Sequence, residues 1–251
     1  MFRNLAVRSG LGALGAVYFA LGVVSVRVGL LGARHDAQGV PAALRFLLAQ
    51  SKGPWLLGAV VAGLAAIALS HGVEAAMGKR RSVLARIGLA FNAIGYAALA
   101  ITAARLLLHV SADGPPLERT GVSWLLRESW GPVVVEIIGA AVAIGGLYEL
   151  YQGVLGRLSF RRDLLPRRLG LLLSGVCRFG LVARGLILCA LGYFLVLAAE
   201  ELNPKRVKTM GGALRALSQT ALGPSLAGAI GLGLCAYGVY LWTLMILKRR
   251  V

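Results

Sequence analysis

The chain has 251 residues, of which 58% are hydrophobic and only 15% are charged, a balance that excludes an ordinary soluble domain. Its formal net charge of +17 would suit a nucleic-acid-binding protein. However, no basic segment is interleaved with aromatic residues, so we expect no nucleic-acid partner. The three cysteines (Cys177, Cys189 and Cys235) form no CxxC motif and lie in or beside apolar runs, which indicates small buried side chains rather than a metal or redox site.

Six uncharged apolar runs follow one another along the chain. A bilayer core of about 30 Å needs roughly 20 mostly apolar helical residues, so each run fits one crossing when polar residues near its ends are allowed. We therefore predict an all-α, polytopic membrane protein with six transmembrane helices. The runs are Gly10–Val26, Pro54–Gly72, Ile87–Ala104, Ile137–Tyr148, Gly185–Ala199 and Gly223–Leu247.

The first run follows Arg3 and Arg8 and resembles a secretory signal. Its Arg-x-Gly opening recurs deep in the chain, however, so we interpret the run as a retained signal-anchor helix.

The runs belong to one unit that is used three times. Each unit reads Arg-x-Gly, apolar run, amphipathic connector, Gly-Pro, apolar run, with the same distance between its two signatures. We predict three two-helix repeats at residues 1–79, 80–158 and 177–251, with a basic linker at residues 159–176. The repeat signature consists of Arg8 and Gly10, Arg86 and Gly88, Arg178 and Gly180, then Gly53 and Pro54, Gly131 and Pro132, Gly223 and Pro224.

The connectors have a helical period of their own. Arg45 and Arg215 each close an Ala-Leu-Arg segment at the same distance before Gly-Pro, whereas the middle copy is degenerate. Leu44, Leu47 and Leu48 stand at i, i+3 and i+4, which predicts one apolar helical face. Each connector should therefore hold a short helix on the outer surface, with proline in the first turn of the next spanning helix.

Small residues recur at four-residue spacing on the expected helices, as in Ala59 with Gly63 and Ala229 with Gly233. Such faces let helices approach closely in lipid. They can serve as packing seams within a compact six-helix bundle or as a contact with another protein, and the sequence leaves both interpretations open.

Charge predicts the orientation. The two termini and both inter-repeat links carry many Lys and Arg residues against a single acid, Asp163. By the positive-inside rule these segments are cytoplasmic, where they would also contact anionic lipid headgroups. The linker at residues 159–176 fits equally an amphipathic segment on the inner membrane face and a solvated basic loop.

Polar residues inside the apolar runs are the candidate site, because such residues are costly in lipid. Helical rise places Arg184, its repeat equivalent Asn92, Glu149 and its equivalent His71 in one inner layer, and we expect an ion pair between Arg184 and Glu149. A second pair, Glu136 with Arg105 or Arg27, is expected in the outer layer. These residues fit either a substrate path or structural ion pairs.

No enzymatic motif is present: the chain lacks HExxH, a Walker A loop, and paired carboxylates on one helix face at the membrane centre. The three histidines fall at different depths, which does not suit a bis-His haem. We expect no enzyme activity, no cofactor and no metal. The leading hypothesis is an accessory or scaffolding subunit that packs against other membrane proteins and lipid. The alternative is a small transporter or channel with a path near Arg184 and Glu149.

The third copy carries a family resemblance, in Arg178–Gly185, Gly211–Arg215, Gly223-Pro224 and Gly233–Tyr240. With the repeat signature, these residues resemble a bacterial membrane family, domain of unknown function 1206, whose members carry tandem two-helix repeats. The resemblance implies a bacterial inner-membrane location and no known activity. Where the family has an arginine at Arg184, the first copy has Leu14 and the second has Asn92, so a role of that arginine would rest on Arg184 alone.

Overall fold

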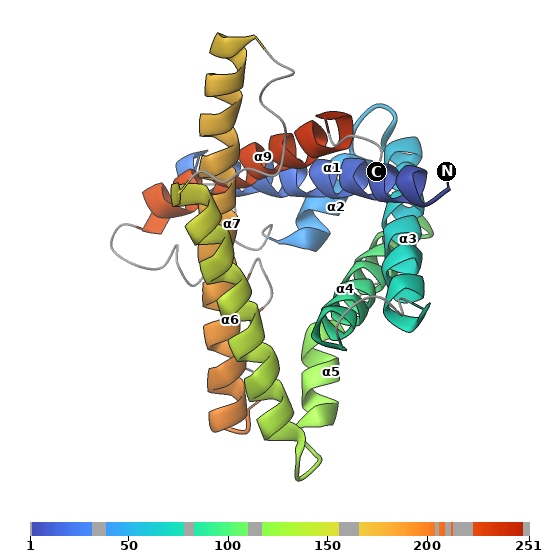
Figure 1. Ribbon diagram of the computed structural model, residues 1–251, viewed down its shortest axis with the longest axis vertical. Helices are drawn as coiled ribbons and strands as arrows, with labels where there is room; N and C mark the ends of the chain where they lie inside the picture. The colour runs from blue at the N-terminus through green and yellow to red at the C-terminus, as the bar shows by residue number, and fades with distance from the viewer. Residues whose placement is uncertain are drawn as a thin grey trace.

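The structure is a computed structural model that describes residues 2–31, 39–77, 83–109, 117–155, 166–203, 206–208, 212 and 223–247. These residues form helices and connecting turns, with no strand among them. The helices are α1 (Phe2–Leu31), α2 (Val40–Leu48), α3 (Gly53–Met77), α4 (Val83–Leu107), α5 (Leu117–Leu125), α6 (Gly131–Leu155), α7 (Arg167–Glu200) and α9 (Gly223–Leu247) (Figure 1).

Six of these helices are long and apolar enough to cross a membrane, namely α1, α3, α4, α6, α7 and α9. The first five extend the predicted runs at both ends, and α9 has the same bounds as the sixth run. The all-α, six-span class predicted from the sequence is therefore confirmed. Residues 167–176, which the sequence analysis assigns to the linker, are helical and lengthen α7 at its N-terminal end.

The connectors in repeats 1 and 2 are short amphipathic helices, α2 and α5, of nine residues each. Ala43 and Leu44 of α2 are completely buried against the spanning helices, so α2 packs into the core. In contrast, α5 contacts α6 and leaves Trp124 61% exposed. The connector predicted around Arg215 lies outside the described residues.

The Gly-Pro signature has a steric reason. The N–H of Gly53 donates to Gln50 O (2.8 Å), and that of Gly131 donates to Glu128 O (3.0 Å), so both copies make the same turn. A Cβ at Gly53 would collide with the carbonyl of Leu48, and a Cβ at Gly131 with that of Leu125. Only glycine fits this close approach, and proline then occupies the first turn of α3 and of α6.

The long helices pair between repeats in one consistent way. The second long helix of each repeat lies along the first long helix of the next: α3 along α4, α6 along α7, and α9 along α1. This cyclic rule gives the three repeats a pseudo-threefold arrangement. The pairs do not run parallel, since α1 and α9 cross α7 steeply, so the compact six-helix bundle expected from the sequence is instead three diverging pairs (Figure 1).

Glycines at equivalent positions allow the two closest pairs. A Cβ at Gly192 of α7 would lie 2.6 Å from Gly139 O of α6, and one at Gly238 of α9 would lie 2.8 Å from Gly15 O of α1. Such backbone approach maximises van der Waals contact where lipid supplies no hydrophobic driving force. The equivalent glycine pairs are Gly22 with Gly231, Gly15 with Gly238, Gly192 with Gly139 and Gly185 with Gly146. The α3/α4 pair has Val61, Ala68, Ala93 and Ala100 at these positions.

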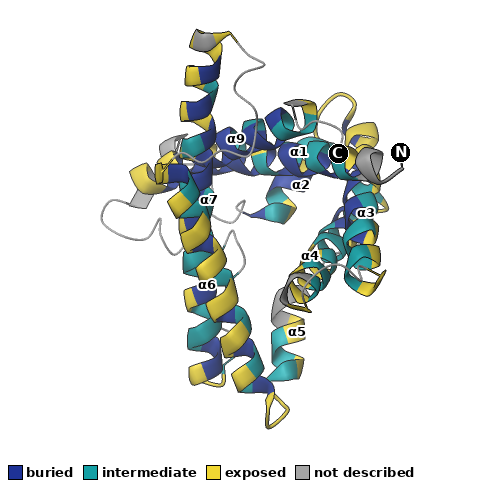
Figure 2. Ribbon diagram, in the orientation of Figure 1, coloured by how far each residue is buried: buried dark blue, intermediate teal, exposed yellow. Residues whose placement is uncertain are grey.

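Contacts within a repeat differ among the three repeats. In repeat 1, α1 packs on α3, and in repeat 3, α7 packs on α9, but in repeat 2 α4 and α6 make almost no contact. Figure 2 shows the consequence: buried residues gather on α1, α2 and α9, whereas the described surfaces of α4 and α6 are largely exposed or half-buried. Repeat 2 is therefore open along one side.

Candidate functional site

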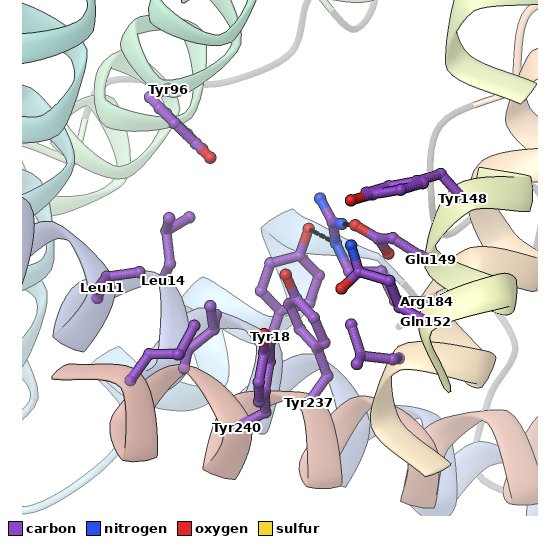
Figure 3. Close-up of a pocket in the computed structure, with 13 residues that line it drawn as sticks. Leu11, Leu14, Tyr18, Tyr96, Tyr148, Glu149, Gln152, Arg184, Tyr237 and Tyr240 are labelled. Atoms are coloured by element: carbon purple, nitrogen blue, oxygen red, sulfur yellow. Dashed lines mark hydrogen bonds and ion pairs between the residues drawn. The ribbon is translucent and has the colours of Figure 1, made fainter. Parts of the chain in front are cut away.

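A pocket of about 270 Å³ lies where the three repeats meet. It is walled by α1, α4, α6, α7 and α9, and its lining joins aromatic, charged and aliphatic side chains (Figure 3). Its lining residues are Leu11, Leu14, Tyr18, Tyr96, Tyr148, Glu149, Gln152, Leu181, Arg184, Tyr237, Tyr240, Leu241 and Leu244.

Arg184 and Glu149 meet at one side of this pocket. The Nη1 of Arg184, on α7, donates to Glu149 Oε1, on α6, and the side chains are 19% and 18% exposed. This is the contact that the sequence analysis expects, while its role stays a prediction. Glu149 Oε2 is buried and has no hydrogen-bond partner among the described residues. The carboxylate therefore keeps one acceptor unused, which is costly in a buried site.

Tyrosines hold the arginine from the other side. The Nε of Arg184 donates to the hydroxyl of Tyr18 (3.0 Å). Its guanidinium lies 5.5 Å from the ring centre of Tyr18 and 4.9 Å from that of Tyr237, both cation–π distances. The two rings meet edge to face at 4.9 Å. Arg184 is thus fixed by one carboxylate and two aromatic rings, which restricts its rotamers.

Several lining residues stand at equivalent positions of the repeats. Tyr18 and Tyr96 are equivalent positions in repeats 1 and 2, and Tyr148 and Tyr240 are equivalent in repeats 2 and 3. Arg184 has Leu14 as its counterpart in repeat 1, and this leucine also lines the pocket. Arginines from all three repeats at one level would repel each other, whereas one arginine and one glutamate leave the site neutral.

The other two residues of the predicted inner layer lie apart from this pair. The ring of His71, on α3, lies 5.6 Å from that of Tyr96. Asn92, on α4, is exposed and donates to Gly88 O of its own helix (3.0 Å). Equal depth along a helix therefore did not bring all four residues into one cluster.

The predicted outer ion pair is wrong. Glu136, Arg105 and Arg27 are all exposed, and within the described residues Glu136 forms no ion pair with either arginine. The physical reason is the pairing of the helices. Glu136 lies on α6, which packs on α7, while Arg105 lies on α4 and Arg27 on α1.

Among the arginines of the signature, Arg86 makes hydrogen bonds to the backbone of another helix. Arg86 donates from Nε to Ala75 O (2.7 Å) and from Nη2 to Ala76 O (3.0 Å), so it caps the last turn of α3. Arg8 and Arg45 are exposed, and Arg178 is half-buried with no described partner for its Nε. Gly10 lies against Ile67, and Gly180 against Tyr237, which accounts for the glycine of Arg-x-Gly in repeats 1 and 3.

The sequence analysis missed most of the aromatic lining. Its candidate site residues include none of Tyr18, Tyr96, Tyr148, Tyr237, Tyr240 and Gln152. The repeat equivalence of Tyr18 with Tyr96, and of Tyr148 with Tyr240, is the signal that could have found them. Among the described residues, no three His, Cys, Asp or Glu side chains gather as a metal site.

Comparison with known proteins agrees with the repeat architecture. The family described as Domain of Unknown Function (DUF1206) matches residues 9–78, 87–156 and 179–244, each segment beginning one residue after the arginine of the signature. The protein described as "Uncharacterized protein YxxB" of Bacillus subtilis (strain 168) is 28% identical over 244 residues, which cover 93% of this chain and 86% of that protein. No solved structure matches the chain. The chain therefore belongs to the DUF1206 family and carries three tandem copies of its domain.

Proposed function

We propose that this protein is a non-enzymatic, multi-pass membrane protein that binds a small molecule in its central pocket and works as a small transporter. One observation carries the proposal: the pocket at the meeting point of the repeats holds the Arg184–Glu149 pair with one carboxylate oxygen unused. Ionisable groups at membrane depth are costly and typically mark a ligand path. The pair alone does not explain why Glu149 Oε2 is left without a partner.

The chemistry of the lining favours binding over catalysis. The two ionised side chains neutralise each other, and the rest of the lining consists of tyrosines, leucines and Gln152. An acid–base enzyme needs convergent titratable groups with separate roles. A neutral pocket with aromatic walls instead suits reversible recognition of a small molecule.

We place the protein in the bacterial inner membrane with both termini in the cytoplasm. The excess of Lys and Arg in the termini and inter-repeat links supports this orientation. The same residues would contact anionic lipid headgroups.

An accessory or scaffolding role is the second candidate. Ala141 and Gly145 form an exposed face of small residues on α6, which would let a helix of another membrane protein approach closely. This face favours a protein partner, whereas the central pocket favours a small molecule.

Native mass spectrometry of the protein released from a mild detergent separates the two candidates. We expect a small-molecule adduct on the wild type that is lost from Arg184→Ala and Glu149→Ala. The exposed Glu136→Ala is the matched control on α6 and should keep the adduct. If other membrane subunits were instead bound to the protein in a fixed ratio and no adduct were present, the accessory role would be established and the transport proposal would be overturned.

A further inference from the structure

Arg184 presents one of its nitrogens to the central pocket. Its Nη1 donates to Glu149, and its Nε donates to the hydroxyl of Tyr18. The described residues supply no ion pair or hydrogen bond to the third nitrogen, Nη2. Figure 3 shows the guanidinium group directed into the space between Tyr96 and Tyr148. The arginine therefore keeps a charged donor for a molecule in the pocket.

The hydroxyl of Tyr18 supplies a second donor beside Nη2. Because this hydroxyl accepts the hydrogen from Nε of Arg184, its own hydrogen is left to donate. Nε and Nη2 lie on the same edge of the planar guanidinium group, so the hydroxyl of Tyr18 is a neighbour of Nη2. A carboxylate suits these two donors, since its two oxygens can accept one hydrogen bond each.

The rest of the lining suits an apolar body on that carboxylate. Tyrosine rings and leucine side chains make up most of the pocket wall, as is usual for sites that bind small organic molecules. The volume of about 270 Å³ lies near the lower end of the range of ligand pockets, about 300 Å³. The ligand should therefore be small, with one ring or a short chain. The leucines of the lining are Leu11, Leu14, Leu181, Leu241 and Leu244.

Charge balance decides what must accompany a carboxylate. Among the described lining residues, Glu149 is the one acid and Arg184 the one strong base, so the pocket is neutral. A bound carboxylate would add one uncompensated negative charge at membrane depth, which is costly. A proton on Glu149 removes this charge. Its Oε2 can take the proton, because no described group donates a hydrogen bond to that oxygen.

We propose that the central pocket takes up a small monocarboxylate together with one proton. The carboxylate binds Nη2 of Arg184 and the hydroxyl of Tyr18, while a proton from solution forms an O–H bond on Glu149. Oε1 of Glu149 remains an acceptor for Nη1, so the arginine stays in place and its charge is available to the ligand. This inference rests on the proposed function and names its ligand class and its coupled ion. A monoanion is selected, because one proton balances one negative charge.

The other titratable groups near Glu149 are phenols and one histidine. The lining tyrosines come from α1, α4, α6 and α9, and phenols keep their hydrogen near neutral pH. The ring of His71, on α3, lies 5.6 Å from that of Tyr96, outside the lining. Histidine is the side chain that ordinarily titrates near neutral pH, so His71→Gln is needed to separate its effect from that of Glu149.

The test measures the affinity of the full chain for benzoate in a neutral detergent by isothermal titration calorimetry. Benzamide (the same ring without charge) and inorganic phosphate (an anion without the ring) are the comparison probes. Benzoate stays ionised between about pH 6 and about pH 8. In this range we expect its dissociation constant to rise about tenfold per pH unit, because about one proton enters with each benzoate. Titrations in two buffers with different ionisation enthalpies count that proton directly.

Conservative variants assign the two roles. Glu149→Gln is permanently neutral and keeps an oxygen for Nη1 of Arg184, which Glu149→Ala does not. It should bind benzoate without pH dependence, and about tenfold more tightly than the wild type at about pH 8. Tyr18→Phe leaves the ion pair intact and should weaken binding several-fold, and Arg184→Gln should abolish it. The exposed Glu136→Gln is the matched control on α6 and should behave as the wild type.

An affinity of the wild type for benzoate that does not change with pH, or a weaker affinity in Glu149→Gln, overturns the inference. Tighter binding of benzamide than of benzoate also overturns it, as does a pH dependence that disappears in His71→Gln. If binding of any probe is still lost in Arg184→Gln, the pocket remains the binding site and only the carboxylate and proton assignments are wrong. If no probe binds the wild type, or if Arg184→Gln changes nothing, the pocket proposal fails together with the inference.

Discussion

Repeat 2 and repeat 3 use the same signature, yet they differ in how their own two long helices meet. In repeat 3, α7 and α9 lie against each other, whereas in repeat 2 α4 and α6 stand apart. Pairing between repeats follows the same rule in all three cases, and in the α1/α9 and α6/α7 pairs it rests on glycines at equivalent positions. Gly10 lies against the side chain of Ile67 in repeat 1, and Gly180 lies against the backbone of Tyr237 in repeat 3, whereas a Cβ at the equivalent Gly88 of repeat 2 would meet nothing within 4 Å. The loss of that contact opens the pseudo-symmetric assembly beside its pocket.

The largest effect is expected from removing the ion pair between Arg184 and Glu149, which joins repeats 2 and 3. Glu149→Ala should destabilise the protein by about 3 kcal/mol, because it leaves Arg184 charged, largely buried and without its carboxylate. The free energy of unfolding in mixed detergent micelles measures the effect. The Glu149→Ala, Arg184→Ala double variant should lose less than the sum of the single variants. Additive losses would show that the pair is not coupled.

Adding a side chain at a helix pair should have the next largest effect. Gly22→Leu in the α1/α9 pair and Gly192→Leu in the α6/α7 pair should each cost about 1–3 kcal/mol, since the new Cβ meets opposing backbone. Gly145→Leu, in open space on α6, is the control and should be close to neutral. Thermal unfolding in detergent provides the comparison. Equal stability of Gly22→Leu and Gly145→Leu would contradict the role of the glycine pairs.

The turns before α3 and α6 should be equally sensitive in repeats 1 and 2. Gly53→Ala and Gly131→Ala should each cost about 1–2 kcal/mol, because the methyl group collides with the carbonyl of Leu48 or Leu125. Gly72→Ala on α3 serves as the reference. Denaturant titration in mixed micelles would detect the loss, and a neutral Gly53→Ala would mean that the turn relaxes freely.

The smallest effect is expected at the cap of α3. Arg86→Met keeps the length of the side chain but removes its donors to Ala75 O and Ala76 O, a loss of about 1 kcal/mol. Hydrogen exchange at the last turn of α3 should rise in this variant. Arg105→Met, at an exposed position of α4, should leave that exchange unchanged, and faster exchange in both variants would remove the assignment of a specific cap.

The sequence was sufficient for features that repeat along the helix axis. The apolar runs located the six long helices, and the spacing of Leu44, Leu47 and Leu48 located α2. Counting residues placed Arg184 and Glu149 at one level. These features depend on helical rise and period, which are local properties of the chain.

Features that depend on direction around the axis were not predictable in the same way. Glu136 and Arg105 were assigned to one layer, but they lie on helices of different pairs. The small residues at four-residue spacing indicated close helix packing, but they did not indicate which helix would be the partner. In repeat 2, Gly145 stands where repeats 1 and 3 have Ile67 and Tyr237, and a Cβ at Gly145 would meet nothing within 4 Å. A comparison of the three copies position by position would have singled out Gly145 as the exception.

The most direct test of the open repeat is a pair of distances measured by double electron–electron resonance in lipid nanodiscs, with the native cysteines replaced. Spin labels at Ile94 and Ile137 report on α4 and α6, and labels at the equivalent exposed positions Leu186 and Ala229 report on α7 and α9. The structure predicts a longer distance between the labels in repeat 2 than between those in repeat 3. The substitution Gly145→Leu should leave the distance in repeat 3 unchanged. Equal distances in the two repeats would contradict the account, because α4 and α6 would then be packed as α7 and α9 are.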